Sequence, residues 1–96
     1  MNSPMPFTLL AYNDRAYRPP TSCDVRAVID MIGLTADQVA ALVGMKDGRA
    51  VRRWLAPGDS KTHAQIGYAA WRLLLMEAGL ITSLRTPTVT GYRDIS

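Results

Sequence analysis

A short basic segment, residues 47–55, places two opposite kinds of surface on what we predict to be a single helix. Three apolar side chains recur at the i, i+3, i+4 spacing of one helix face, and three arginines recur at the same spacing on another face. With about 100° between successive residues, the centres of the two sets lie roughly 160° apart. The two sets are Val51, Trp54 and Leu55, and Arg49, Arg52 and Arg53.

Arginine suits two features of DNA. Its planar guanidinium donates parallel hydrogen bonds to phosphate oxygens and to the edge of a guanine base. A helix that is anchored by an apolar face and presents three guanidinium groups therefore fits a DNA groove. The spacing alone does not separate this interpretation from an ordinary solvated helix face, which shows the same pattern.

The residues before this segment favour the DNA interpretation. Thr35 and Gln38 have the spacing of a capping box, which predicts the start of a short helix. Gly44 is free to adopt the left-handed conformation that ends a helix, and Asp47 can cap the next one. The predicted order is a helix, a short glycine turn and a basic helix, which is the arrangement of a helix-turn-helix.

Residues 34–55 resemble the helix-turn-helix of Cro/repressor-type regulators. They are similar to small regulators carried by phages and mobile elements, including those that repress anti-CRISPR operons, and residues 66–80 resemble the helix that often follows. The resemblance implies that Ala40 is the small residue of the first helix, Gly44 the turn glycine and Val51 the buried aliphatic residue.

One departure from the family pattern concerns the turn. Val51 lies one residue farther from the turn glycine than the commonest spacing, which implies a turn lengthened by one residue around positions 46–48. The departure leaves open whether Lys46, Arg49 or Ala50 reaches the bases.

The charge distribution agrees with a basic binding element. The chain has 96 residues, enough for one domain, and a formal net charge of +3. Residues 22–45 carry three acidic and one basic side chain, a net charge of −2. Residues 46–72 carry six basic and two acidic side chains, a net charge of +4. The positive charge thus concentrates on the predicted DNA-binding element.

We predict a mainly α-helical fold: a small helical bundle with a helix-turn-helix, flanked by short strand-like N- and C-terminal segments. One helix starts near Ser22 and stops at Gly33. A capping box at 62–65 opens the longest helix, which runs to Ala78. Strands are expected at 7–12 and 88–92. The expected division is an extended arm (1–21), a DNA-binding domain (22–80) and a C-terminal tail (81–96).

The predicted helix at 65–78 has more apolar surface than one core face requires. Trp71, Leu75 and Met76 extend this surface around most of the helix. A helix that is apolar nearly all round is central or shared with another chain, so we expect these residues to contribute to a homodimer interface. The alternative is that the N-terminal strand and the tail fold over the helix.

Several function classes are excluded or disfavoured. One cysteine and one histidine provide neither an internal disulfide nor a metal site. Neither a phosphate-binding loop nor a recognisable catalytic carboxylate pair is present. Nothing resembles a secretory signal or a membrane span. We therefore expect a cytoplasmic protein that is not an enzyme and has no cofactor, metal or membrane partner.

The resulting prediction is a sequence-specific regulator of transcription, a repressor by family analogy, that binds double-stranded DNA at a palindromic operator as a homodimer. The helix at 47–55 reads the major groove. Predicted DNA contacts are Gln38, Lys46, Arg49, Arg52, Arg53, Lys61, Thr62 and His63. Two alternatives remain: a protein-interaction module of the antitoxin or anti-activator kind, and an RNA-binding accessory protein.

Overall fold

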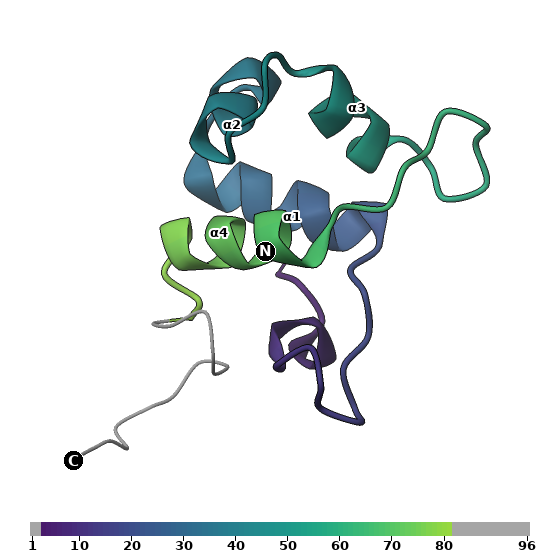
Figure 1. Cartoon of the computed structure of the whole chain (residues 1–96), viewed down its shortest axis with the longest axis vertical. Coiled ribbons are helices and arrows are strands. Elements are labelled where there is room, and N and C mark those ends of the chain that lie inside the picture. The colour runs from purple at the N-terminus through teal and green to yellow at the C-terminus, as the bar shows by residue number, and fades with distance from the viewer. Residues whose placement is uncertain (1–2, 82–96) are drawn as a thin grey trace.

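Helices dominate the chain, and no strand occurs among residues 3–81, which are the residues described by the structure, a computed structural model. A short 3-10 helix precedes four α-helices (Figure 1). The elements are η1 (Pro6–Leu9), α1 (Ser22–Ile32), α2 (Ala36–Leu42), α3 (Arg49–Leu55) and α4 (Tyr68–Glu77). The prediction of a small, mainly α-helical bundle is confirmed. The strand expected at 88–92 lies outside the described residues.

Capping boxes start the first two α-helices. At α1, the Asp24 N–H donates to the Thr21 hydroxyl at 3.3 Å, and the Thr21 N–H donates to the Asp24 carboxylate at 2.9 Å. At α2, the corresponding distances between Gln38 and Thr35 are 3.2 and 2.9 Å. These bonds satisfy N–H groups that have no partner inside a helix. The predicted capping box at Thr35 is confirmed.

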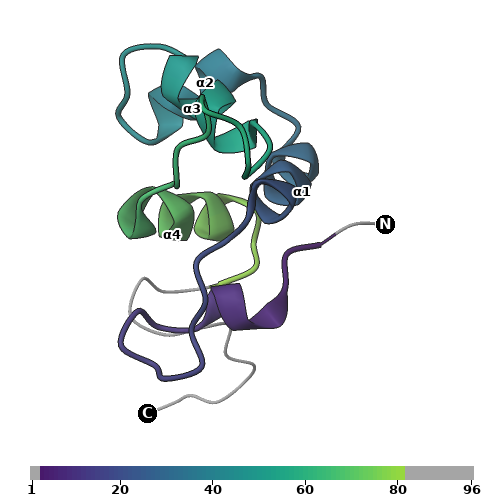
Figure 2. The same ribbon diagram turned by 90° about the vertical axis from the view of Figure 1, so that its right-hand side faces the viewer.

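The helices lie in two layers, with α2 and α3 resting on α1 and α4 (Figures 1 and 2). The inner face of α3 supplies Val51, which has no exposed surface, and Trp54, which is 4% exposed. Val39 and Ala40 of α2 are also fully buried. The predicted burial of Val51 and Trp54 is confirmed, and it leaves the arginine face of α3 turned outward.

A Schellman motif ends α2. Gly44 adopts a left-handed φ of 82°, its N–H donates to the Ala41 carbonyl at 3.2 Å, and the Met45 N–H donates to the Ala40 carbonyl at 2.7 Å. The two bonds satisfy carbonyl groups left without partners at the helix end. Gly44 is therefore the helix terminator that the sequence predicts.

The start of α3 is pressed against the start of α2 at Gly48. The Gly48 N–H donates to Asp37 Oδ1 at 2.8 Å. A β-carbon at position 48 would lie 2.5 Å from that oxygen and 3.0 Å from two backbone atoms, the Ala36 carbonyl carbon and the Asp37 nitrogen. Only glycine lets the two helix starts approach this closely.

The predicted N-terminal strand at Phe7–Tyr12 is wrong. Residues Pro6–Leu9 form the 3-10 helix η1, which lies against α4. The Trp71 indole N–H donates to the Thr8 carbonyl at 2.8 Å, and the buried Arg72 guanidinium donates to the Leu9 carbonyl at 2.7 Å. The carbonyl groups of Thr8, Leu9 and Leu10 are thus paired with side chains of α4 and need no neighbouring strand.

Two of the three residues predicted for the dimer interface, Trp71 and Leu75, are buried within the chain itself. Trp71 and Leu75 have no exposed surface, because the chain's own residues cover them. Neither side chain is available to a second chain in this structure. Met76 is 39% exposed and Leu73, on the same helix, is 38% exposed. The N-terminal segment covers part of the excess apolar surface predicted for this helix, since it accepts the Trp71 indole N–H at Thr8.

The predicted helix start at 62–65 is also wrong, since α4 begins at Tyr68. The side chains of the expected capping box have other partners. The Thr62 hydroxyl lies 2.9 Å from the Ser60 hydroxyl, and the Gln65 amide donates to the Pro20 carbonyl at 3.0 Å. Gln65 therefore ties the loop before α4 to the segment before α1. At 11 residues, α1 is longer than the 10-residue α4.

Replacing Gly48 with alanine is expected to destabilise the domain. The added β-carbon meets backbone atoms that cannot rotate away, so the cost is that of overpacking, about 1–3 kcal/mol. Gly58→Ala is the matched control, because nothing lies within 4 Å of its β-carbon position. Urea unfolding measures both variants. Equal midpoints for Gly48→Ala and the control would contradict the close approach of the two helices.

Replacing Trp54 with alanine is expected to cost on the order of 3–5 kcal/mol, because it removes a large, almost fully buried ring. That loss is a large part of the total stability of a small domain. Thermal and urea unfolding provide the measurement, with Trp54→Phe as a variant that keeps an aromatic ring in the core. A Trp54→Ala protein that unfolds like the parent protein would show that the ring does not anchor α3.

Candidate nucleic-acid interface

The outer face of α3 presents its arginines to solvent. The side chain of Arg49 is 80% exposed and that of Arg52 is 60% exposed. Arg53 is exposed as well, while Val51 and Trp54 face the core between them. The alternation follows from the helical spacing of the two sets, so the predicted separation of the faces is present in the structure.

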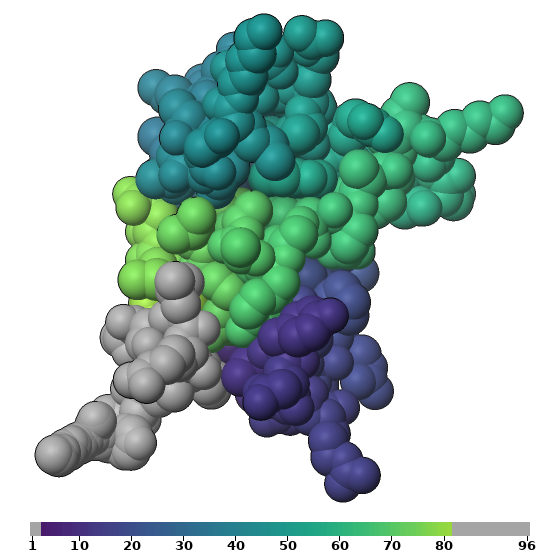
Figure 3. All heavy atoms as spheres, in the orientation of Figure 1, coloured from purple at the N-terminus to yellow at the C-terminus, as the bar shows by residue number. Residues whose placement is uncertain are grey.

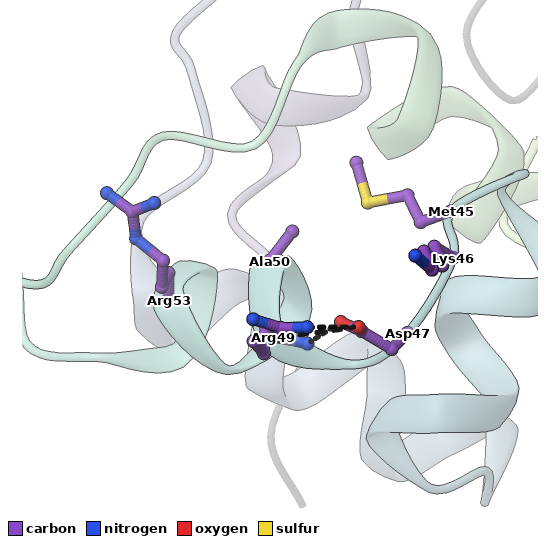
Figure 4. Close-up of a pocket in the computed structure, with 6 residues that line it drawn as sticks. All are labelled: Met45, Lys46, Asp47, Arg49, Ala50 and Arg53. Carbon is purple, nitrogen blue, oxygen red and sulfur yellow. Dashed lines mark hydrogen bonds and ion pairs between the residues drawn. The ribbon is translucent and has the colours of Figure 1, made fainter.

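Asp47 is the partner of Arg49. The carboxylate accepts the Arg49 backbone N–H at 3.0 Å, and it accepts Nε and Nη2 of the guanidinium at 3.2 and 3.1 Å (Figure 4). The backbone bond first, and then the guanidinium, hold the pKa of the Asp47 carboxyl below its ordinary value. The carboxylate therefore remains ionised at neutral pH.

Asp47 also performs part of the predicted capping. The residue directly before α3 is Gly48, and Asp47 reaches past it to the first N–H of the helix. Its negative charge lies near the positive end of the helix dipole, which is the favourable arrangement.

Asp37 connects Arg52 to the turn. One Arg52 nitrogen lies 4.0 Å from Asp37 Oδ1, the oxygen that also accepts the Gly48 N–H. Both partners are well exposed, so the ion pair adds little to stability. Its consequence is geometric, because the carboxylate that joins α2 to α3 also lies beside the second arginine of α3.

Arg53 is hydrogen-bonded to the loop between α3 and α4. This loop projects from the body of the molecule (Figure 3). Its Nε donates to the Thr62 carbonyl at 3.2 Å, and its own carbonyl accepts the Ala64 N–H at 3.0 Å. The His63 Nδ1 lies 2.9 Å from the Ala56 carbonyl. Because a carbonyl oxygen only accepts, Nδ1 carries the hydrogen. The loop is thus fastened to the end of α3.

A shallow hollow lies at the start of α3 (Figure 4). Its volume is about 460 Å³. It brings three cations together around one carboxylate and two apolar side chains, and its lining residues are Met45, Lys46, Asp47, Arg49, Ala50 and Arg53. The three cations make this part of the surface attractive to a polyanion.

The predicted contact residues form three groups. Lys46, Arg49 and Arg53 line the hollow, and Arg52 lies next to it on α3. The second group is the loop, which carries an exposed Lys61 and Thr62 and a half-buried His63. The third is Gln38 alone, which is exposed on α2 and whose side-chain oxygen is occupied by the Thr35 N–H.

Sequence reasoning missed the carboxylate partners of the arginines. Asp47 was predicted only as a helix cap, and Asp37 had no predicted role. The one signal for Asp47 was its position two residues before Arg49, near enough for a contact. The pairing of Asp37 depends on how α2 meets α3, which no local pattern specifies.

Other kinds of site are not apparent in the described part of the chain. Residues 3–81 contain no group of three or more histidine, cysteine, aspartate or glutamate side chains placed to hold a metal ion. Within that range, no helix is both long enough and apolar enough to cross a membrane.

Comparison with known proteins identifies relatives. A protein named transcriptional repressor protein KorC from Escherichia coli is 41% identical over 63 residues, which cover 64% of this chain and 68% of the relative. A second Escherichia coli protein of the same name is 38% identical over 63 residues with the same coverage. Neither a family model nor a solved structure matches the chain. The identity over most of both proteins shows that the chain belongs to the KorC family of transcriptional repressor proteins.

Proposed function

We propose that this protein represses transcription by binding double-stranded DNA at a specific sequence, with α3 in the major groove. The observation that carries the proposal is the outward face of α3, which presents Arg49, Arg52 and Arg53 while the opposite face is buried. A DNA-binding domain is sufficient for this activity, because occupying a promoter is enough to block transcription. The names of the KorC relatives support repression over activation.

We further propose that α2, the connection at 43–48 and α3 are a helix-turn-helix of the Cro/repressor type. Three features support this. Ala40 is fully buried, Gly44 adopts the left-handed conformation, and Val51 is fully buried. A link to phages or mobile elements rests on the resemblance of the sequence to regulators found there, and a cytoplasmic location follows from the proposed action on DNA in a bacterial cell.

The predicted contact residues divide by position. Residues at the start of a recognition helix reach base edges, while those farther along it and in flanking loops contact phosphates. Lys46 and Arg49 belong to the first group. Arg52, Arg53 and the loop residues Lys61, Thr62 and His63 belong to the second, and Gln38 contacts the backbone beside the start of α2.

Double-stranded DNA is preferred over single-stranded nucleic acid as the ligand. Proteins that bind single strands stack bases on exposed aromatic rings placed among basic residues. Trp54 and Trp71 are both buried in the core, and the exposed rings of Phe7 and Tyr12 belong to the segment before α1, so within the described part of the chain the basic face of α3 has no such platform.

A homodimer on a palindromic operator remains part of the proposal. We place the proposed dimer contact on exposed residues of α4 and not on the buried ones. Ala69, Leu73 and Met76 are exposed and follow the i, i+4, i+7 spacing of one helix face. Pairing two copies through this face would place two α3 helices on one DNA site and double the phosphate contacts.

Arginine substitutions on α3 test DNA binding. A random pool of duplexes is first used to select the bound sequence. Arg52→Ala and Arg53→Ala are then expected to weaken binding to the selected duplex and to leave thermal stability nearly unchanged. Loss of a phosphate contact should lower the slope of log affinity against log salt by about one.

Arg26→Ala is the matched control, because it removes an exposed arginine from α1. It should leave binding close to that of the parent protein. If the α3 variants bind like the control, or if the parent protein selects no sequence, α3 is not a recognition helix.

Charged substitutions on α4 test the dimer. Leu73→Lys combined with Met76→Lys is expected to convert the protein to a monomer at micromolar concentration, because two charges would have to be buried in the contact. Analytical ultracentrifugation gives the mass. Met31→Lys is the control, since Met31 is 42% exposed on α1. A parent protein that sediments as a monomer while it binds its duplex tightly would exclude the dimer.

A further inference from the structure

Asp47 holds the Arg49 side chain in one orientation. Its Oδ1 accepts the Arg49 backbone N–H at 3.0 Å, and its Oδ2 accepts Nε and Nη2 of the guanidinium at 3.2 and 3.1 Å. The first bond fixes the carboxylate to the start of α3. The other two fix the guanidinium to the carboxylate, and such a double contact orients the plane of the group as well as its position.

The contact with Asp47 leaves the terminal edge of the Arg49 guanidinium, formed by Nη1 and Nη2, available to a ligand. Asp47 occupies the edge formed by Nε and Nη2, so the donors of Nη1 and the second hydrogen of Nη2 stay accessible on a side chain that is 80% exposed. With the Nε–Nη2 edge occupied by Asp47, the two terminal nitrogens can still donate a parallel pair of hydrogen bonds to guanine O6 and N7.

The charge of Asp47 disfavours phosphate at this position. A phosphate oxygen that approached the Arg49 guanidinium would also approach an ionised carboxylate, and the two negative charges repel each other. A guanine edge carries no net charge and offers two acceptors. The carboxylate therefore favours a base edge over the DNA backbone as the partner of Arg49.

The other cations around the hollow lack this arrangement. Within residues 3–81, the second ion pair joins Arg52 to Asp37 at the longer distance of 4.0 Å, without a double hydrogen bond. Arg53 donates to the Thr62 carbonyl, which is uncharged. Lys46 is exposed and belongs to neither ion pair of that part of the chain.

We propose that Asp47 is a positioning residue that commits Arg49 to reading a guanine and makes this pair the main source of sequence preference in α3. The proposal rests on the proposed function and names the residue that gives it specificity. The lengthened turn left open whether Lys46, Arg49 or Ala50 reaches the bases. The proposal assigns this role to Arg49, because its guanidinium is held by a double contact.

The competing explanation is that Asp47 only caps the helix, and two variants distinguish these roles. Asp47→Asn keeps one oxygen to accept the Arg49 backbone N–H, but it loses the charge and the second acceptor. Arg49→Lys keeps the positive charge and leaves the cap untouched, but lysine cannot donate two parallel hydrogen bonds. Asp30→Asn makes the same change of charge at an exposed position on α1 and is the control.

The experiment selects bound duplexes from a random pool for the parent protein and each variant, and then measures affinity for the selected duplex and for its single base-pair substitutions. The parent protein is expected to prefer guanine at one position of each half-site. Asp47→Asn and Arg49→Lys should both reduce the preference at that position by roughly tenfold or more. Affinity for unrelated duplexes should be unchanged for Arg49→Lys and unchanged or higher for Asp47→Asn.

The outcomes separate this inference from the proposed function. If the parent protein selects a sequence and Asp47→Asn keeps the full preference at every position, Asp47 is only a cap and DNA recognition stands. If Asp47→Asn fails to fold, Arg49→Lys decides alone, since retained preference there overturns the inference. A parent protein that selects no sequence overturns both.

Discussion

The close contact between Gly48 and the first turn of α2 determines how the residues of the candidate interface are arranged. The Gly48 N–H donates to Asp37, and no β-carbon fits between the two helix starts. The contact fixes where α3 begins, and the residue that begins it is Arg49. The same Asp37 carboxylate lies beside Arg52. Because residue 48 is a glycine, α3 can begin this close to α2, and this close approach sets the positions of Arg49 and Arg52 on the surface.

The side-chain contact between Asp47 and Arg49 was missed although the two residues are close in the sequence, but local signals were sufficient for other interactions within one turn of chain. The Thr35–Gln38 capping box and the helix end at Gly44 are of this kind, and both were predicted correctly. The burial of Val51 and Trp54 was also predictable, because helical spacing alone puts them opposite the arginines. These elements define α2, the turn and α3, which is the part of the chain that positions the candidate site.

Most of the wrong predictions involve partners that are distant in the sequence. Gln65 has the spacing of a capping residue, but its amide donates to a carbonyl 45 residues away, at Pro20. From the sequence, Trp71 was counted as surplus apolar surface. In the structure its indole N–H donates to the carbonyl of Thr8, 63 residues away. Such contacts exist only once the helices have packed, so a short sequence window contains no signal for them. The pairing of Arg52 with Asp37 was missed for the same reason.

The partners of the three arginines suggest how one short helix can divide affinity from specificity. A free arginine loses rotamer freedom when it binds, whereas one held beforehand has already lost it. Arg49 is held by two bonds to a carboxylate, Arg53 by one bond to a carbonyl, and Arg52 by a longer ion pair. The carboxylates also cancel part of the positive charge of α3, which weakens attraction to arbitrary DNA. In the proposed recognition of DNA, Asp47 would therefore act twice: it would lower attraction that is independent of sequence, and it would prepare Arg49 for the contact that depends on sequence.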